Sequence, residues 1–203
     1  MLICIPECLR KLEIHFASLP TIMQLNKYAI LKNLLYLKKE KLMSNIWVIS
    51  DTHFFHENIL KFTDSTTGEL VRGGRFSSVN EMNECMLDNW NSVVSPGDKV
   101  YHLGDVTMGH REEFLKFWPK LNGSKRLIVG NHDDIKFLST GGLFAKVQMW
   151  RMFPEFGLLF SHVPLHINSL YRYPPKGSDE IFDVATASTM LNVHGHIHQN
   201  PSP

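Results

Sequence analysis

Five short apolar segments, each followed within two residues by Asp, Asn or His, constrain this chain more than any other feature. Their β-branched and large apolar residues predict buried strands, because such runs suit a sheet that is covered on both faces. Helical patterns separate several of these segments, and strands that alternate with helices indicate an α/β layered fold. The expected strands cover residues 46–50, 99–103, 126–129, 157–160 and 191–193.

Two helices are expected between these strands. Ser78 and Glu81 have the spacing of a capping box, which predicts a helix start. Apolar residues then recur three and four positions apart, and this face indicates core packing. The expected buried face consists of Val79, Met82, Met86, Trp90 and Val93. A second helix is expected over about 110–118, ending at Pro119.

The polar residues that follow the strands offer oxygen and imidazole donors. In open α/β sheets, ligands bind beyond the carboxyl ends of the strands, so five loops are expected to deliver these donors to one edge. The donors carry no accompanying Cys, a set that suits Mn, Fe, Zn, Co or Ni rather than a thiolate-bound structural zinc. In chain order they are Asp51, His53, Asp105, Asn131, His132, Asp133, His162, His196 and His198.

The order of these residues carries more information than any one of them. A single D-x-H is more often a turn than a pair of ligands, and a lone buried His is more often a core residue. In an extended segment, however, residues two apart point to the same side, so His196 and His198 can reach one site. The ordered set as a whole therefore predicts a metal site.

This set, D-x-H, G-D, G-N-H-D, H and G-H-x-H, resembles the calcineurin-like metallophosphoesterase superfamily over about residues 46–198. The local sequences DTHF at 51–54 and VYHLGD at 100–105 are similar to those of small bacterial and phage metallophosphoesterases. The resemblance implies two mixed β-sheets packed face to face and flanked by helices. It also implies two divalent metal ions, for which Mn is the first choice and Fe, Zn, Ni or Co are alternatives.

The resemblance assigns roles residue by residue. The implied ligands are Asp51, His53 and His198 for one ion, Asn131, His162 and His196 for the other, and Asp105 for both. His132 would face the substrate phosphate and support the leaving group, with Asp133 as its orienting partner. These roles make His132 and Asp133 the expected catalytic pair.

Elementary chemistry supports that assignment. Two divalent ions ~3.5–4 Å apart need a bridging carboxylate and clamp both oxygens of an in-line displacement. A water between them becomes hydroxide near neutral pH, and a protonated His132 can donate to the departing alkoxide. We therefore expect direct attack by hydroxide on a small phosphoester, such as a nucleotide, without a covalent phospho-enzyme. The expected activity is that of a phosphodiesterase or phosphatase.

Three further residues are candidates for substrate contact. His56 and Asn58 either line the phosphate pocket or cap the helix that follows. Arg75 lies in a polar, Gly-rich insertion at residues 63–77. It either contacts phosphate, for which a guanidinium group is well shaped, or is an ordinary surface residue. The insertion itself is expected to act as a lid that sets substrate size.

The charge balance bears on two alternative functions. The chain has 21 Lys and Arg against 20 Asp and Glu, and residues 43–203 carry 14 basic and 17 acidic side chains. A nuclease of the same superfamily would need a basic track for the phosphate backbone, so nucleic acid is not the expected partner. A non-catalytic binding or scaffold protein on this fold would typically lack His132 or some of the ligands.

The two ends of the chain differ from its body. Residues 1–42 are an expected N-terminal amphipathic extension, with a short helix at 30–42 that lies on the body or on a membrane surface. The alternative is that Met43 is the natural start. Residues 43–203 are the expected metallophosphoesterase domain. Because only residues 199–203 follow the last motif, we expect it to be truncated and short of its last strand. Three Cys and no export or transmembrane segment favour the cytoplasm.

Overall fold

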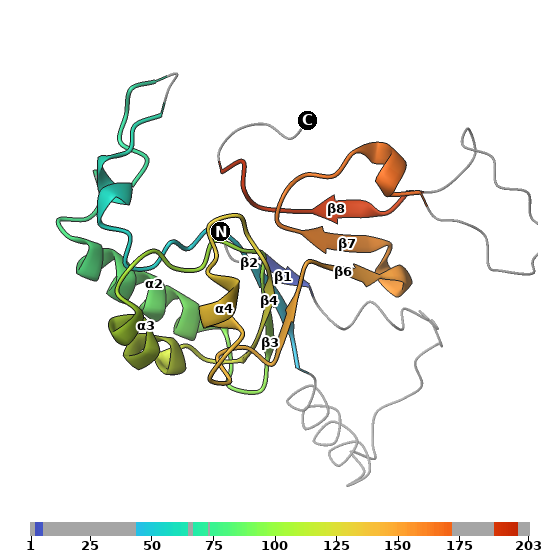
Figure 1. Cartoon of the computed structure of the whole chain (residues 1–203), viewed down its shortest axis with the longest axis horizontal. Helices are drawn as coiled ribbons and strands as arrows, with labels where there is room; N and C mark the ends of the chain where they lie inside the picture. The colour runs from blue at the N-terminus through green and yellow to red at the C-terminus, as the bar shows by residue number, and fades with distance from the viewer. Residues whose placement is uncertain (1–2, 6–43, 65–66, 73, 172–188, 199–203) are drawn as a thin grey trace, which may run out of the picture.

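The computed structural model describes residues 3–5, 44–64, 67–72, 74–171 and 189–198 (Figure 1). The helix expected at 30–42 lies outside these residues. The elements that the model does describe form two sheets with helices beside them, so the predicted α/β sandwich is confirmed. The larger sheet has the strand order β1-β2-β3-β4-β5 and the smaller one the order β6-β7-β8.

The larger sheet brings three of the predicted site loops to one edge. Its strands β2 (Ile46–Ile49), β3 (Lys99–His102), β4 (Ser124–Ile128) and β5 (Lys146–Gln148) are parallel. Ile49 lies opposite His102, and His102 lies opposite Leu127, so β2, β3 and β4 end at the same level. The residues that follow these strands therefore leave the sheet side by side. Strand β1 (Ile3–Ile5), which sequence reasoning did not predict, pairs antiparallel with β2.

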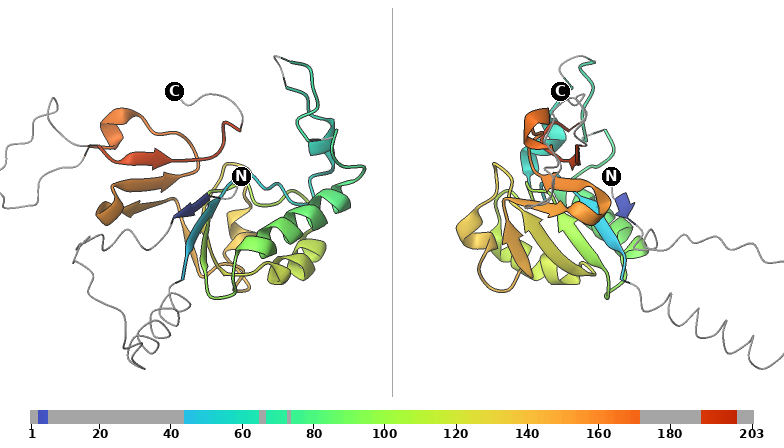
Figure 2. Two further views of the ribbon diagram at one scale, coloured as in Figure 1. Left: turned by 180° about the vertical axis from the view of Figure 1, so that it is seen from behind. Right: turned by 90° about the vertical axis from the view of Figure 1, so that its right-hand side faces the viewer.

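The smaller sheet carries the other two site loops. It consists of β6 (Trp150–Phe153), β7 (Leu158–Ser161) and β8 (Leu191–Val193). Strand β7 is antiparallel to β6 and parallel to β8, so the sheet is mixed as predicted. Figures 1 and 2 show its three strands, in orange and red, on the side of the larger sheet that faces away from the helices.

The helices lie on the other face of the larger sheet (Figure 1). They are α2 (Val79–Val93), α3 (Arg111–Phe117) and α4 (Ile135–Leu138), with the short 3-10 helix η3 (Trp118–Lys120) directly after α3. Three further 3-10 helices lie elsewhere: η2 (Glu57–Lys61) in the segment after β2, and η4 (Pro154–Phe156) and η5 (Ile167–Ser169) beside the smaller sheet. Among them, none combines the length and the apolar character that a membrane span requires.

The first helix differs from its prediction in two details. Ser78 caps α2 by accepting from the Glu81 N–H, but the Glu81 carboxylate accepts from Ser77 rather than from Ser78. The expected buried residue Val93 is 47% exposed in the last turn, whereas Asn83 is buried. Asn83 is buried because its side-chain oxygen accepts from the N–H of Phe55, in the loop after β2. The helix thus supports a site loop through a polar residue that hydrophobic periodicity does not select.

Two apolar cores flank the larger sheet. One lies under the helices and is built around Phe54, Trp90, Phe114, Trp118 and Leu127. The other joins the two sheets, and consists of Ile46, Val48, Tyr101, Leu103, Ile128, Phe153 and Phe160. Because this second core draws side chains from both sheets, the sheets pack face to face. It holds the loops that follow β7 and β8 against those that follow β2, β3 and β4.

Truncation of Phe160 tests this packing. Phe160 is fully buried, with its ring 5.5 Å from Tyr101 and 5.0 Å from Phe153. Phe160→Ala is expected to lower the free energy of unfolding by about 3–5 kcal/mol, through lost apolar burial and the cavity left behind. Trp150→Ala, a larger truncation at a 61% exposed position of the same sheet, should cost less than about 1 kcal/mol. Equal effects in urea denaturation would contradict the sandwich core.

Candidate metal centre

The loops after β2 and β3 continue the parallel pairing beyond the sheet. The N–H of Asp51 donates to the carbonyl of Gly104 at 3.0 Å, and that of His53 donates to the carbonyl of Asp105 at 3.0 Å. The N–H of Phe54 donates to Val106 at 2.9 Å. These bonds join the two loops, so the spacing of Asp51, His53 and Asp105 follows from the sheet itself.

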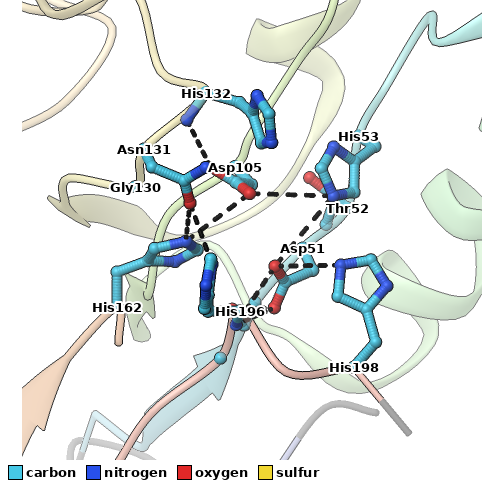
Figure 3. A network of polar contacts seen from close by, with 12 residues as sticks. Asp51, Thr52, His53, Asp105, Gly130, Asn131, His132, His162, His196 and His198 are labelled. Carbon is cyan, nitrogen blue, oxygen red and sulfur yellow. Dashed lines mark hydrogen bonds and ion pairs between the residues drawn. The ribbon is translucent and has the colours of Figure 1, made fainter. Parts of the chain in front are cut away.

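Five of the predicted ligands have a left-handed backbone. Their φ angles are 53° at Asp51, 47° at His53, 56° at Asp105, 67° at His196 and 52° at His198. Such angles cost a non-glycine residue about 1–2 kcal/mol, and residues held in them cluster at functional sites. The left-handed turns direct the side chains of three separate loops toward one another, as Figure 3 shows.

The first group consists of Asp51, His53 and His198, whose donor atoms lie within 4.8 Å of one another. Asp51 Oδ1 is 4.0 Å from His53 Nε2 and 3.5 Å from His198 Nε2. Both ring nitrogens of His53 are buried without a hydrogen-bond partner in the described part of the chain. Burial lowers the pKa of His53 to about 4, so its ring is neutral. A buried, neutral and unpartnered imidazole fits a metal ligand.

The second group consists of Asp105, His162 and His196, with Asn131 beside them. Asn131 Oδ1 lies 2.8 Å from His162 Nε2 and 2.9 Å from His196 Nδ1. His162 Nδ1 lies 2.7 Å from the carbonyl of Leu103, which requires this nitrogen to donate. In a neutral ring Nε2 then has a lone pair, and it faces the Asn131 oxygen lone pairs. A cation shared by these atoms removes that repulsion, so the donor set fits a metal ion.

Asp105 lies between the two groups. Its Oδ2 is 3.9 Å from His53 Nε2 and 3.5 Å from His162 Nε2, while its Oδ1 accepts from the N–H of His132 at 2.9 Å (Figure 3). The carboxylate packs against the backbone of Gly130. A side chain at that position would not fit, because its Cβ would collide with Asp105 Oδ1. One buried carboxylate thus faces both sets of ligands.

Comparison with known proteins agrees with this geometry. The family model for calcineurin-like phosphoesterases matches residues 44–201. The chain belongs to that family. The chain is 41% identical over 96 residues to an uncharacterized protein of Methanocaldococcus jannaschii, covering 45% of the chain and 48% of that protein. It is 32% identical over 94 residues to the gene 66 protein of Mycobacterium phage L5, and this match covers 45% of the chain and 41% of the phage protein. The chain thus aligns with about half the length of these curated relatives.

One solved structure is also similar. It is a protein of unknown function from Aquifex aeolicus, 34% identical, with a TM-score of 0.47 over 59% of this chain and 60% of that one.

The structure gives different surroundings to His132 and Asp133, the expected catalytic pair. His132 is exposed, and its ring lies 6.2 Å from that of His53. The Asp133 carboxylate instead accepts from the backbone N–H groups of Gly130, Asp105 and Val106. Burial raises the pKa of Asp133. These bonds join the loop after β4, which carries Asn131 and His132, to the loop after β3, which carries Asp105.

A cavity of about 490 Å³ lies against the two groups of ligands, and His132 is part of its lining. Of the three candidates for substrate contact, His56 lines this cavity. Asn58 and Arg75 are exposed and lie outside the lining, and the Asn58 side chain accepts from Lys61 instead. The expected lid at residues 63–77 does contribute to the wall, through Thr63, Val71 and Arg72, and Phe62 precedes it there.

Arg72 is the residue in this wall that sequence reasoning missed. Its guanidinium donates to the carbonyl of Thr52 at 2.8 Å and to that of Asp51 at 2.6 Å. It is largely buried, and burial lowers its pKa. Arg72 therefore connects the insertion to the backbone of the D-x-H turn. The sequence feature that could have identified Arg72 is an Arg within a Gly-rich loop. Arg75 shares this feature, so the sequence does not distinguish the two residues.

Replacement of Arg72 tests this connection. Arg72→Met leaves the carbonyls of Asp51 and Thr52 without their donors, and we expect it to weaken Mn²⁺ binding by about tenfold or more, as loss of outer contacts to metal ligands does. Arg72→Lys should restore part of the affinity, because one amine reaches one carbonyl. Arg75→Met, at an exposed position in the same insertion, is the control. Calorimetric titration with Mn²⁺ measures all three, and equal affinities for Arg72→Met and Arg75→Met would refute the role.

Proposed function

We propose that this chain is a dinuclear metal-dependent phosphoesterase that hydrolyses a small phosphoester, such as a nucleotide, by direct in-line attack. The observation that carries the proposal is the position of Asp105. Its Oδ2 atom lies near His53 Nε2 of the first ligand group and near His162 Nε2 of the second. Membership in the calcineurin-like phosphoesterase family supports the reaction class. Residues 43–203 are the proposed catalytic domain, and the cytoplasm is the proposed compartment.

In this proposal each group holds one divalent ion. The ligands are Asp51, His53 and His198 for one, Asn131, His162 and His196 for the other, and Asp105 for both. Mn is the first choice, with Fe, Zn, Ni or Co as alternatives, because all accept oxygen and imidazole ligands. When bound, the two ions supply hydroxide at neutral pH and offset the charge on the phosphoryl oxygens.

The side chains around the cavity perform the remaining steps. His132 borders both the cavity and the ligand groups, where a protonated ring can donate to the oxygen of the leaving group. Asp133 holds the His132 loop through its bonds to the backbone of the neighbouring loops. The apolar side chains of Ile59, Phe62 and Val71 line the wall. They suit an organic leaving group better than a bare phosphate.

The test is hydrolysis of chromogenic phosphodiesters and phosphomonoesters with added Mn²⁺. His132→Ala is expected to lower kcat by about 100-fold on an ester with a poor leaving group, in line with the usual contribution of a general acid. The loss should be smaller for p-nitrophenol, which departs without a proton. His166→Ala, at an exposed position outside the cavity lining, should leave kcat unchanged.

Two results would contradict the proposal. Failure of every ester to turn over, in protein that binds two ions, would exclude the activity. An equal loss of kcat for good and poor leaving groups in His132→Ala would exclude the proton-donor role while leaving the metal centre intact.

A further inference from the structure

A second cavity, of about 240 Å³, opens between the two sheets at the amino ends of the strands. Lys99 and Ile46, which begin β3 and β2, belong to its lining. The metal ligands instead follow the carboxyl ends of these strands, which are at the top of the larger sheet in Figure 1. A four-residue strand is roughly 13 Å long, so the second cavity is separate from the metal centre.

The lining of this cavity carries four cationic side chains. Tyr101, Arg126 and Lys146 lie in one row across β3, β4 and β5, and directly paired residues of neighbouring strands point to the same face. Lys99 lies two residues before Tyr101 and therefore on that face as well. Arg151 joins them from β6 of the smaller sheet. The face of the larger sheet that packs on the smaller sheet is thus apolar near the carboxyl ends of the strands, where the metal centre lies, and cationic near their amino ends.

Aromatic rings hold the two guanidinium groups. The guanidinium of Arg126 lies 5.6 Å from the ring centre of Tyr101, and that of Arg151 lies 5.0 Å from the ring centre of Phe153. The two rings are buried and pack edge to face, 5.4 Å apart. Because both rings are fixed in the core, each guanidinium group is held at the cavity before any ligand arrives. The Nη1 of Arg126 also donates to the carbonyl of Ser124 at 3.2 Å, and the remaining N–H groups of the stacked guanidinium are suited to contact with an oxyanion.

In the described ranges, no ion pair joins Lys99, Arg126, Lys146 or Arg151 to a carboxylate. Among the described residues of the lining, Glu155 is the one acidic side chain, and it is exposed. Cations gathered in a confined space repel one another and attract anions. The net charge of the chain conceals this cluster, because acidic residues elsewhere cancel it.

We propose that this cavity binds a compact phosphate-type oxyanion, such as pyrophosphate or the polyphosphate group of a nucleotide. Its volume equals roughly eight water molecules at ~30 Å³ each, which suits two or three linked phosphate units. A nucleic acid would instead need an extended basic track. This site is independent of the proposed hydrolysis, because it shares no residue with the metal centre.

Binding of pyrophosphate to the full chain, measured by calorimetry at low ionic strength without added metal, tests the proposal. Arg126→Gln and Lys146→Gln should each weaken binding by about tenfold, the effect of one lost charge-assisted contact. Lys116→Gln changes the charge equally on the exposed face of α3 and should have no effect. Lys146 is exposed, so its variant is expected to fold normally.

A metal-centre variant separates the two sites. Asp105→Asn should bind pyrophosphate as tightly as the wild type, because Asp105 lies at the other end of the strands. Binding that is lost in Asp105→Asn and retained in Arg126→Gln would overturn the proposal. So would the absence of binding, or binding of an oligonucleotide through Arg126 and Lys146 that pyrophosphate does not displace. Loss of hydrolysis in Asp105→Asn with intact pyrophosphate binding would support both proposals separately.

Discussion

The parallel pairing of β2 with β3, carried past the ends of the strands, is the interaction on which the site depends. It sets Asp51, His53 and Asp105 at fixed spacing through bonds between the two loop backbones. Asp105 then lies at the centre of the ligand set, where its side chain faces His53 from one loop and His162 from the smaller sheet. The backbone pairing of the sheet thus positions the Asp105 carboxylate, and the other ligand side chains lie around it.

Hydrogen bonds from residues outside the ligand set hold the ligand loops in place. Arg72 and Asp133 bind the backbone of the ligand loops, and His102 bonds the Thr52 hydroxyl at 2.9 Å. Burial lowers the pKa of His102 to about 3, so its ring stays neutral in the core. Asn83 on α2 adds a bond to the Phe55 N–H. These polar residues stabilise left-handed turns that a non-glycine backbone would otherwise avoid.

Hydrophobic runs predicted the α/β layers, and the donors that follow them predicted the convergence of the ligands, while the two-sheet sandwich was implied by the family resemblance. Both are local patterns, because each donor comes next to the strand that positions it. Arg72 and Asn83 escaped prediction because their roles are contacts with the backbone of loops distant in the sequence. The role of Asp133 depends in the same way on which backbone N–H groups surround it. Strands β1, β5 and β6 are short, and β5 and β6 carry charged and exposed residues that mask a strand pattern.

The central claim is that Asp105 unites two metal positions in one centre. The most direct measurement is the metal content of the purified chain by mass spectrometry after reconstitution with Mn²⁺, for the wild type and Asp105→Asn. The account predicts two ions per wild-type chain, and fewer in a folded Asp105→Asn chain, because both positions lose a shared ligand. One ion per chain in the wild type, or two in both proteins, would contradict it.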